Sequence, residues 1–295
     1  MNVTLRQIEV FLAVANFSHV GKAAEALNIS QSAVSMALSQ FEEAVSEKLF
    51  DRSSRKIFLN DAGKKLLPFA RKAYEAAAEV ENFRSDGRVK GRLKIGASTT
   101  IGNYLLPFII GGFAEKFPDT EIVMEVGNTA VISKGVMEHE LDLGFTEGPV
   151  DEDEITEFFW RKDKLTVFAP VSFIEENYKP DKPVWIIREK GSGTREVFES
   201  AMEKAGIGFK IKMELGHTEA IKKAVEAGLG IGCLSELAVS GEIGRGVFRR
   251  LNFKNADFSR DLNFIFRKDK HFTASMKALI DYCLKEGIKT AGYPD

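Results

Sequence analysis

The stretch VGKAAEALNISQSAVSMALSQF, residues 20–41, decides the fold of the N-terminal part of this chain. Apolar residues recur at helical spacing in both halves of the stretch, and the polar break Asn28-Ile29-Ser30 separates the halves. The pattern predicts two short helices joined by a tight turn, which is a helix-turn-helix. Small side chains at Ala23 and Ala24 allow the second helix to approach closely, and the Ser30 hydroxyl is placed to cap that helix.

The second helix presents a polar face that is suited to contacting DNA bases. Val34, Leu38 and Phe41 form its apolar face and are expected in the core. The opposite face carries short, uncharged groups able to hydrogen-bond base edges in a major groove, namely Gln31, Ser32, Ser35, Met36 and Ser39. A helical hairpin without any role in DNA binding has the same local pattern, so the flanking sequence has to decide between the two interpretations.

The flanking sequence favours a winged DNA-binding domain over residues 1–60. Upstream, apolar residues at helical spacing in residues 5–14 predict a helix that completes a three-helix core. Downstream, the apolar runs at 49–50 and 57–59 enclose a polar tip, the pattern of a small β-hairpin. Its Arg52, Arg55 and Lys56 are predicted to contact the phosphate backbone, although a solvated charged turn has the same local sequence.

Length and composition limit the possible classes of protein. At 295 residues the chain suits two or three domains, and 44% hydrophobic with 28% charged residues is typical of a soluble globular protein. The net charge is −2, and residues 1–62 hold six basic and seven acidic side chains, so DNA binding depends on where the positive charges lie. The N-terminus lacks a signal-peptide pattern, no apolar run is long enough to span a membrane, and two cysteines give no disulfide framework, so we expect a cytoplasmic location. The four histidines lack metal-ligand spacing, and we expect neither a metal nor a cofactor.

A long amphipathic helix is predicted over residues 61–84, and a polar linker at 85–91 follows it. Pro68 falls inside this helix, so we expect either a local bend or a helix that begins near that residue. The apolar side of the helix needs a partner. Pairing with the same helix of a second chain would bury it and bring two DNA-binding domains together, so residues 61–91 are assigned to dimerisation and a hinge.

From residue 92 to residue 295 the pattern changes to alternating strands and helices. Strands are expected at 93–97, 121–126, 141–145, 184–187, 211–214 and 230–233, and helices at 102–117, 129–138, 194–204 and 218–227. The alternation predicts two α/β lobes, with lobe I formed by 92–166 and 267–295 and lobe II by 167–266. The chain is expected to cross between them at about 167–170 and again near 266, before a last helix at 271–286.

Nearly every strand-to-helix turn of the two lobes carries a hydroxyl group. In an α/β sheet these turns bring backbone N–H groups and positive helix ends together, which is where ligands bind. The proposed effector-binding residues are Ser98, Thr99, Thr100, Asn128, Thr129, Thr146, Glu147, Ser192, Gly193, Thr194, Arg195, His217 and Thr218. At any single turn an ordinary helix N-cap is the better explanation, but five such turns facing one cleft favour a site for a small anion.

Three of these residues have particular expected roles. Arg195 supplies positive charge for the anion, and Thr194 both caps its helix and binds the ligand. Glu147 opposes an anion, so it is expected either to pair with Arg195 or a nearby lysine, or to select a ligand that offers a proton or a positive charge. No serine has a His/Asp pair at diagnostic spacing, so we assign no catalytic residues.

The chain resembles the LysR-type transcriptional regulators over essentially its full length. The resemblance is carried by TLRQIEVFLAVANFSHVGKAAEALNISQSAVSMALSQFE and the following LFDRSSRKIFLNDAG. Phe41 stands where that family usually has leucine, and Asn60 where threonine is common. The resemblance implies an α+β multidomain fold: an N-terminal winged helix-turn-helix, a linker helix, and a two-lobed α/β effector domain like a periplasmic binding protein. It also implies a homotetramer made of two dimers, and a partnership with RNA polymerase.

The second half resembles the branch that regulates carbon-dioxide fixation and sulfite or sulfur assimilation. Its motifs here are STTIGNYLLP, EVGNT, EGP, GSGTRE and ELGHTEAIKKAVEAGLGIGCLS. By this resemblance, the turns at 98–100 and 192–195, with Thr146 and Thr218, would face an inducer between the lobes. His217 stands where this branch often has serine, which implies pH sensitivity or an altered specificity.

We therefore expect a regulator, not an enzyme, that binds double-stranded DNA in a sequence-specific manner as a homodimer or homotetramer. Its expected effector is a small anionic metabolite such as the sulfur oxyanion sulfite, and the alternative is a small carboxylate or a phosphorylated metabolite. A solute-binding protein is one rival, because the two-lobed half alone would suit transport. A hydrolase that uses Ser192 is the other rival.

Overall fold

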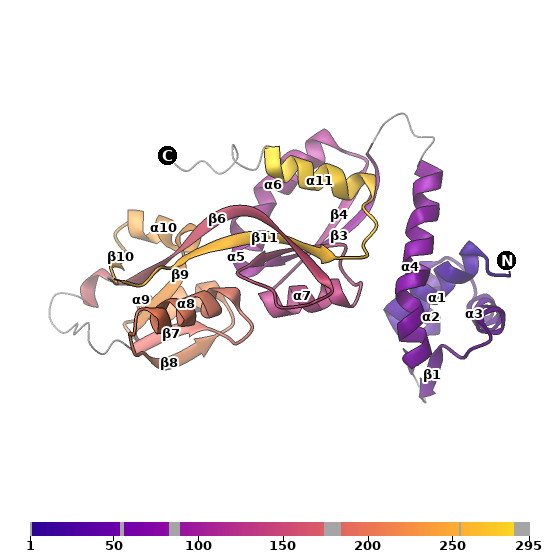
Figure 1. The fold of residues 1–295 in the computed structure, drawn as a ribbon, viewed down its shortest axis with the longest axis horizontal. Helices are drawn as coiled ribbons and strands as arrows, with labels where there is room; N and C mark the ends of the chain where they lie inside the picture. Colours follow the sequence, from indigo (N-terminus) through magenta and orange to yellow (C-terminus); the bar gives the residue numbers. More distant parts are fainter. Residues whose placement is uncertain (1, 54–55, 83–88, 174–183, 254, 286–295) are drawn as a thin grey trace. The chain divides into compact units, whose positions relative to one another are not determined.

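The computed structural model describes residues 2–53, 56–82, 89–173, 184–253 and 255–285, and the chain divides into two compact units. The N-terminal unit holds helices α1 to α4 and a two-stranded sheet, and the second unit holds the remaining strands and helices (Figure 1). The division falls between residues 88 and 89.

The N-terminal unit is a winged helix-turn-helix, as the sequence predicts. Asn28 has a left-handed backbone (φ 52°) in the turn between the second and third helices. The Ser30 Oγ accepts a hydrogen bond from the Ala33 N–H at 3.1 Å, so the predicted cap is confirmed. The elements of this unit are α1 (Leu5–Phe17), α2 (Val20–Ala26), α3 (Gln31–Val45), β1 (Phe50–Ser53), β2 (Lys56–Leu59) and α4 (Asp61–Asn82).

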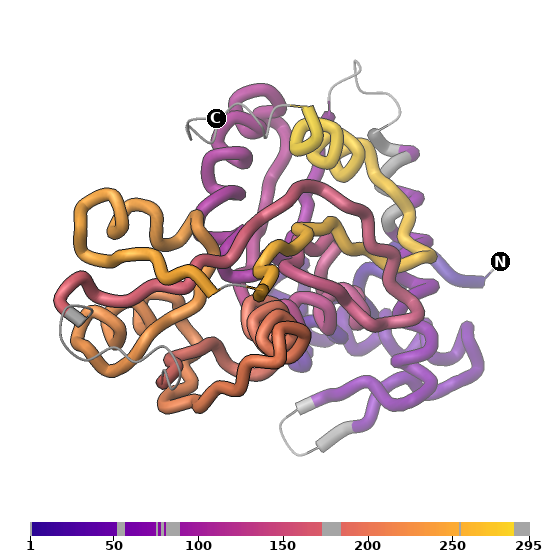
Figure 2. The backbone as a smooth tube through the Cα atoms, turned by 60° about the vertical axis from the view of Figure 1, so that its left-hand side comes forward, coloured from indigo at the N-terminus to yellow at the C-terminus, as the bar shows by residue number. Residues whose placement is uncertain are grey.

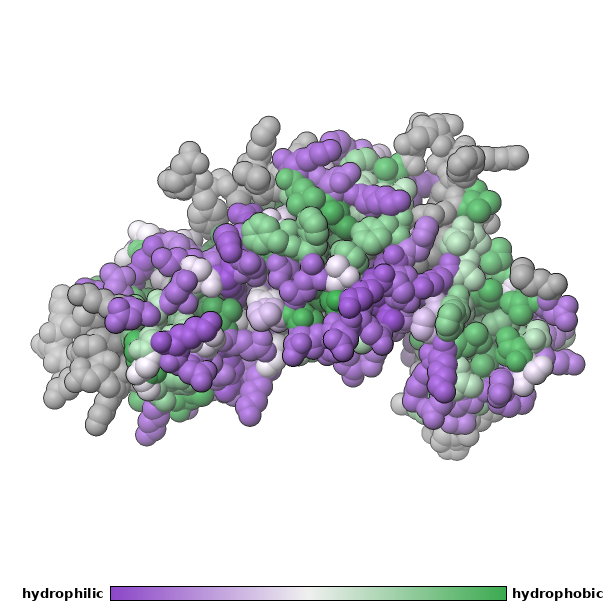
Figure 3. Space-filling view, viewed as in Figure 1, coloured by the Kyte–Doolittle hydropathy of each residue, from purple (hydrophilic) through white to green (hydrophobic). Residues whose placement is uncertain are grey.

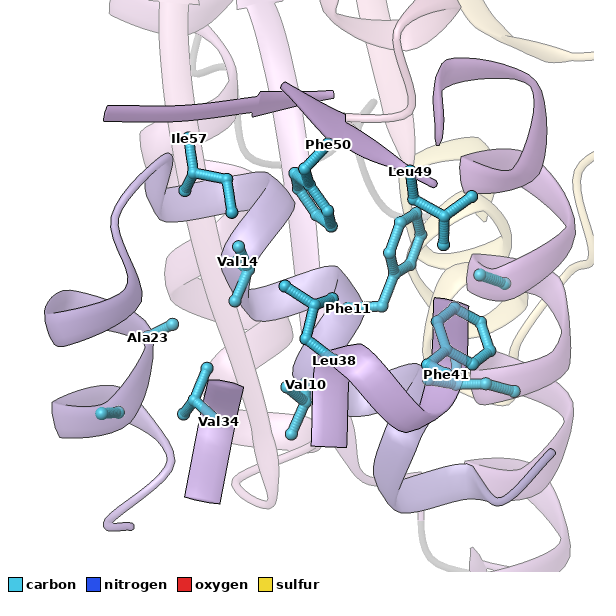
Figure 4. Close-up of a cluster of buried hydrophobic side chains, with 13 residues drawn as sticks. Val10, Phe11, Val14, Ala23, Val34, Leu38, Phe41, Leu49, Phe50 and Ile57 are labelled. Atoms are coloured by element: carbon cyan, nitrogen blue, oxygen red, sulfur yellow. The ribbon is translucent and has the colours of Figure 1, made fainter. Parts of the chain in front are cut away.

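An apolar core built from the helices and the hairpin holds this unit together (Figure 4). The Phe11 ring of α1 is fully buried, and its centroid lies 5.3 Å from that of Phe41 on α3 and 5.5 Å from that of Phe50 on β1. Ala23 and Ala24 on α2 are 0% and 3% exposed, which is the close helix packing that their small size predicts. Burial of three aromatic rings around one point fixes the hairpin to the helices.

The linker helix α4 runs from Asp61 to Asn82 with Pro68 inside it. The alternative that the helix begins near Pro68 is therefore wrong. Asn60 caps its start, because the Asn60 Oδ1 accepts the Gly63 N–H at 2.8 Å. A Cβ atom at Gly63 would lie 2.2 Å from the carbonyl oxygen of Leu49, so only glycine allows α4 to lie this close to the chain that enters β1.

The second unit is built on a nine-stranded sheet with the strand order β4-β3-β5-β11-β6-β9-β7-β8, and β10 pairs with β6. The alternation of strands and helices agrees with the predicted α/β architecture. Its elements are β3 (Gly91–Ser98), α5 (Thr99–Tyr104), α6 (Leu106–Lys116), β4 (Thr120–Gly127), α7 (Thr129–Met137), β5 (Leu143–Glu147), β6 (Ile155–Pro170), η1 (Val171–Phe173), β7 (Val184–Arg188), α8 (Gly193–Lys204), β8 (Lys210–Leu215), α9 (Thr218–Glu226), β9 (Ile231–Ser235), α10 (Glu236–Gly244), β10 (Phe248–Leu251), β11 (Ser259–Arg267) and α11 (Ala274–Lys285).

Two long antiparallel strands, β6 and β11, connect the lobes and run side by side (Figures 1 and 2). Residues 155–164 of β6 pair with β11, and residues 165–168 pair with β9 of lobe II. Residues 262–265 of β11 pair with β5 of lobe I. The second crossing therefore lies near 258–260 and not near 266 as predicted. The reason is the register of the two strands: Ser259 of β11 lies opposite Lys164 of β6, so both strands pass between the lobes at the same place.

The sequence pattern also missed or merged several elements. It gave no prediction for the first half of β6, for α10 or for β10. The single helix predicted at 102–117 is two helices, α5 and α6, with Leu105 between them. Pro107 lies in the first turn of α6, where its missing N–H costs no hydrogen bond. Among the described helices, none has both the length and the apolar character that crossing a membrane requires.

Replacing Gly63 with alanine is expected to lower the free energy of unfolding of the N-terminal unit by about 1–3 kcal/mol, the usual cost of overpacking. The reason is the 2.2 Å approach to the Leu49 carbonyl. Urea unfolding of the full chain measures the change. The control is Gly111→Ala on α6, where a Cβ atom meets nothing within 4 Å. Equal stability of Gly63→Ala and wild type would contradict the packing described here.

Candidate DNA-binding surface and effector site

The face of α3 that the sequence assigns to DNA lies outside the core. Val34 and Leu38 on the opposite face are buried. Ser30 Oγ and Ser32 Oγ lie 2.8 Å apart and share a hydrogen bond, which orients the Ser32 hydroxyl. All five predicted side chains, Gln31, Ser32, Ser35, Met36 and Ser39, are exposed, and Met36 is 61% exposed. The face is uncharged and accessible, as contact with base edges requires.

The predicted hairpin is present in β1 and β2. Arg52 pairs with Ile57 and Ser53 pairs with Lys56 in the antiparallel register, so Arg52 and Lys56 flank the tip of the hairpin. The third predicted phosphate contact, Arg55, lies outside the described residues. The Ile57 N–H donates to the Ser18 carbonyl oxygen at 3.3 Å, which fixes β2 to the turn between α1 and α2.

Glu42 on α3 has a structural role that the sequence analysis did not assign. Its side chain is 6% exposed and accepts hydrogen bonds from the Lys48 Nζ at 2.8 Å and from the Leu49 N–H at 2.9 Å. Burial by itself raises the pKa of Glu42, but these bonds and the charge on Lys48 outweigh burial and lower the pKa below its ordinary value. The carboxylate thus ties α3 to the start of the hairpin.

In the second unit, Glu147 at the end of β5 is the centre of a buried polar network. Its Oε1 accepts the Thr100 N–H at 2.6 Å, and its Oε2 accepts the hydroxyls of Thr100 and Thr194, each at 3.0 Å. Arg260 Nη1 donates to the same Oε2 at 2.7 Å. Burial opposes ionisation, but the charge on Arg260 and the Thr100 N–H outweigh it and lower the pKa of Glu147 to about 2.

Arg260 joins this centre to the strands that connect the lobes. Its guanidinium is 1% exposed, and its Nε and Nη2 each lie 2.7 Å from Asp163 Oδ2 on β6. Asp163 Oδ1 in turn accepts the Ser235 hydroxyl at 2.9 Å, at the end of β9. The network therefore links β5 of lobe I, both connecting strands, and β9 and α8 of lobe II.

Further contacts between the lobes lie around the start of α7. The Asn128 Nδ2 donates to Glu189 Oε1 at 3.1 Å, and the Ala130 N–H donates to the Gly191 carbonyl at 3.1 Å. A Cβ atom at Gly193 would lie 1.5 Å from the Glu147 carbonyl oxygen, so glycine is required for α8 to approach β5. Thr129 Oγ1 donates to the same carbonyl at 3.3 Å.

The structure corrects the roles expected for Arg195, Thr194 and Glu147. Arg195 does not meet Glu147, because its guanidinium pairs with Glu199 at 2.8 Å and with Glu214. The partner of Glu147 is Arg260, which is neither Arg195 nor a lysine. Thr194 does not cap α8, since its hydroxyl donates to Glu147.

Another buried arginine at the contact between the lobes is Arg188, at the end of β7. It is 2% exposed, its Nη2 donates to Thr99 Oγ1 at 3.1 Å, and Glu189 pairs with it at 2.8 Å. Thr99 Oγ1 donates onward to the Gly127 carbonyl at 3.1 Å. Arg188 thus connects lobe II to the turn after β3 in lobe I.

The remaining predicted residues divide into two groups. The hydroxyls of Ser98, Thr146 and Thr218 are buried and have no hydrogen-bond partner within the described part of the chain. Ser98, Ser192 and the exposed His217 occupy N-cap positions but make no side-chain cap bond, whereas Asn128 caps α7 by accepting the Val131 N–H at 3.0 Å. The N-cap explanation therefore accounts for Asn128 only.

Sequence reasoning missed Arg260 and Arg188, which carry the positive charge of this region. Arg260 shares the strand face of Phe258 and Leu262, both of which are buried. A charged residue between buried apolar positions is a signal of a buried ion pair, but none of the expected strands includes residue 260, so the signal was missed. The sequence around Arg188 gives no such signal. Arg188 is the last residue of the apolar run of β7, a position at which a charged side chain is usually exposed to solvent.

A winged helix-turn-helix joined to a two-lobed α/β domain with a polar interlobe centre defines a DNA-binding regulator with an effector-binding domain. Two family descriptions match the chain: "Bacterial regulatory helix-turn-helix protein, lysR family" over residues 5–64 and "LysR substrate binding domain" over residues 86–287. The chain belongs to the LysR family of transcriptional regulators, which are not enzymes.

Relatives and solved structures agree with this assignment. The chain is 37% identical to the HTH-type transcriptional regulator YeiE of Escherichia coli (strain K12), over 96% of this chain and 98% of YeiE. It is 30% identical to the RuBisCO operon transcriptional regulator of Acidithiobacillus ferrooxidans, over 95% and 93% of the two chains. A full-length OxyR variant from Pseudomonas aeruginosa has the same fold, with a TM-score of 0.76 at 21% identity and coverage of 96% and 95%. The CcmR regulatory domain of Synechocystis PCC6803, solved in complex with 2-PG, gives a TM-score of 0.61 at 25% identity over 70% of this chain and 100% of that domain.

The pKa of Glu147 predicts how acid affects stability. The pKa is lowered from 4.5 to about 2, so the stabilisation is complete above about pH 4.5 and is lost as the pH falls toward 2. This group should account for about 3 kcal/mol of the acid loss in the free energy of unfolding of the second unit.

Glu147→Gln should remove that part of the pH dependence and lower the stability at pH 7, because Arg260 loses one of its two carboxylate partners. Urea unfolding at several pH values between 7 and 2 checks both effects. The control is Glu203→Gln, an exposed residue of α8. An unchanged acid dependence in Glu147→Gln would contradict the assignment.

Proposed function

We propose that this LysR-family regulator binds its operator DNA through α3 and the β1–β2 hairpin, and that a small anion bound between the lobes controls it. The bases contact Gln31, Ser32, Ser35, Met36 and Ser39. The phosphates contact Arg52, Arg55 and Lys56. Two features support this proposal. One face of α3 is exposed and uncharged while its opposite face is buried in the core, and a basic hairpin follows α3 in the sequence.

The observation that carries the anion proposal is the set of donors around Glu147. A backbone N–H at the start of α5, two threonine hydroxyls and a guanidinium all converge on one carboxylate, and these are the groups with which proteins bind oxyanions. An anionic effector has to take the place of the Glu147 carboxylate or to bind beside it. Arg188 is near enough for its charge to act on Glu147, and the turns of the same two lobes hold the Thr146 and Thr218 hydroxyls, which have no hydrogen-bond partner within the described residues.

A small oxyanion such as sulfite suits donors that already enclose a single carboxylate group. The alternative is a small carboxylate or a phosphorylated metabolite, and the CcmR regulatory domain solved with 2-PG favours testing that class as well. The remaining predicted turn residues, Ser98, Asn128, Thr129, Ser192, Gly193, Arg195 and His217, hold or line the lobe contacts in this proposal. An effector changes DNA binding only by favouring one arrangement of the lobes over another.

Self-association through α4 belongs to the same proposal. Phe69 and Val80 on this helix are 69% and 74% exposed, and apolar surface runs along α4 in Figure 3. Pairing two such helices would bury that surface and place two α3 helices on one operator. Assembly into a homodimer or homotetramer, and contact with RNA polymerase, follow from family membership as further parts of the proposal.

Two substitutions separate base contacts from phosphate contacts. Binding sites are first selected from random DNA with the full chain, and affinities are then measured at several salt concentrations. Arg55→Ala should weaken binding about equally on all sequences and lower the salt slope by about 1, whereas Ser35→Ala should change the sequence preference. Lys64→Ala, at the start of α4, is the control with no expected effect. Wild-type behaviour of both Arg55→Ala and Ser35→Ala would exclude this mode of binding.

A thermal-shift screen of the full chain tests the anion. The ligands are sulfite, sulfate, thiosulfate, phosphate and short carboxylates. At a hundred times its dissociation constant, the true class of ligand should stabilise the second unit by about 2.7 kcal/mol, a shift of about 5–10 °C. Thr100→Val should abolish the shift, and Thr120→Val, at the start of β4, should keep it. No shift with any anion would refute the effector proposal and leave the DNA proposal intact.

A further inference from the structure

A cavity of about 630 Å³ lies between α8 and β11, and none of the predicted effector residues lines it. Its volume is within the range of small-molecule sites. One wall belongs to lobe I and the opposite wall to lobe II. Its lining includes Glu157 on β6, Glu196 and Ser200 on α8, and Arg260 and Asn263 on β11.

The lining combines apolar and polar groups. Val197 and Ala201 supply apolar lining from α8. Next to Val197 lies Gly148, just after the end of β5, where an added Cβ atom would lie 3.6 Å from Val197 Cγ2. The cavity therefore has apolar lining on α8 beside polar walls, a usual layout of a ligand site.

The walls carry more negative than positive charge. Four carboxylates line the cavity against two cations, Lys204 and Arg260. The guanidinium of Arg260 is already held by Glu147 and Asp163. Of the four carboxylates, Asp261 pairs with Lys162, and Asp257 accepts the Ser259 N–H at 3.0 Å.

Glu157 and Glu196 are the carboxylates that have no ion pair among the described residues, and they come from opposite walls. Partial burial raises the pKa of Glu157, and partial burial together with the charge on Glu199 raises the pKa of Glu196. Both groups therefore gain from a nearby positive charge.

Asn263 adds a hydrogen-bond acceptor that the protein leaves unused. The residue is 7% exposed, and its Nδ2 lies 3.4 Å from Glu157 Oε2. Its Oδ1 has no hydrogen-bond partner among the described residues and is absent from their fully enclosed unpaired atoms, so it opens toward the cavity. A carbonyl oxygen that is accessible from the cavity and has no donor among the described residues can accept a hydrogen bond from an N–H group of a ligand.

We propose that this cavity binds a small diamine, with one ammonium group held by Glu157 and Asn263 and the other by Glu196. Such a ligand bridges the lobe I wall and the lobe II wall. It also contacts α8 and β11, the elements that carry Thr194 and Arg260 of the interlobe network, so it stabilises the arrangement of the lobes described here.

Calorimetric titration of the full chain with 1,4-diaminobutane tests the proposal. Wild type should show saturable binding at one site per chain, and 1,4-butanediol, which has the same length and no charge, should not bind. Glu196→Gln and Glu157→Gln should each raise the dissociation constant about tenfold or more, because a charge-assisted hydrogen bond is lost. Glu203→Gln, an exposed carboxylate on α8 outside the cavity lining, is the matched control and should bind as wild type does.

Filling the cavity with a larger, charged side chain gives an independent check of where the diamine binds. Ser200→Lys places an ammonium group in the cavity and should abolish diamine binding, while Ser200→Ala should retain it. The proposal is overturned by the absence of saturable binding to wild type, or by equal losses in Glu196→Gln and Glu203→Gln. It is also overturned if Glu147→Gln abolishes binding while Glu196→Gln does not, because the diamine would then occupy the interlobe centre. None of these outcomes depends on whether an anion binds there.

Discussion

The buried charges of Glu147, Arg260 and Asp163 are the interaction on which the effector domain depends. Removing one member of a buried ion pair leaves the other uncompensated in a medium of low polarity, which costs several kcal/mol. Here the three charges come from β5, β11 and β6, and threonines from α5 and α8 complete their hydrogen bonds. The lobes therefore move apart only if these donors and acceptors find other partners. A ligand that supplies such a partner changes the relative free energies of the lobe arrangements, which is how binding becomes a signal.

The N-terminal unit is subject to a different constraint. It carries a slight excess of acidic side chains, and DNA is a polyanion that repels them. One of its acidic groups, Glu42, is buried and accepts hydrogen bonds from the Lys48 Nζ and the Leu49 N–H. The α3 face contributes no charge, while the hairpin places Arg52 and Lys56 on paired strands. In the proposed mode of binding, local charge placement therefore replaces net charge as the source of attraction to phosphates. The aromatic contacts of Phe11 with Phe41 and Phe50 keep the helix and hairpin in one rigid frame.

Much of this was predictable from local patterns. Helical spacing located α2 and α3, the Ser30 cap and the small residues Ala23 and Ala24 were identified correctly, and the strand–helix alternation gave the two lobes. The second crossing between the lobes was misplaced, because an apolar run at 262–266 indicates a strand but not which sheet it joins. The sequence suggested Arg195 or a nearby lysine as the partner of Glu147, because proximity to a glycine turn is visible in a sequence, whereas the register of β11 beside β5, which brings Arg260 there, is not.

The sequence by itself determined the winged helix-turn-helix and the hydroxyl-rich ends of the strands, since each follows from periodicity or from residues close together in the chain, and its motifs indicated the family. It also predicts which side of α3 faces DNA. Only the tertiary structure decided which charges meet. It joined Glu147 to a residue 113 positions away, left the Thr146 and Thr218 hydroxyls without partners in the described part of the chain, and formed an acidic cavity behind α8. The physical reason is that ion pairing depends on distances of a few ångströms in space, and strand register, which no local pattern specifies, sets those distances.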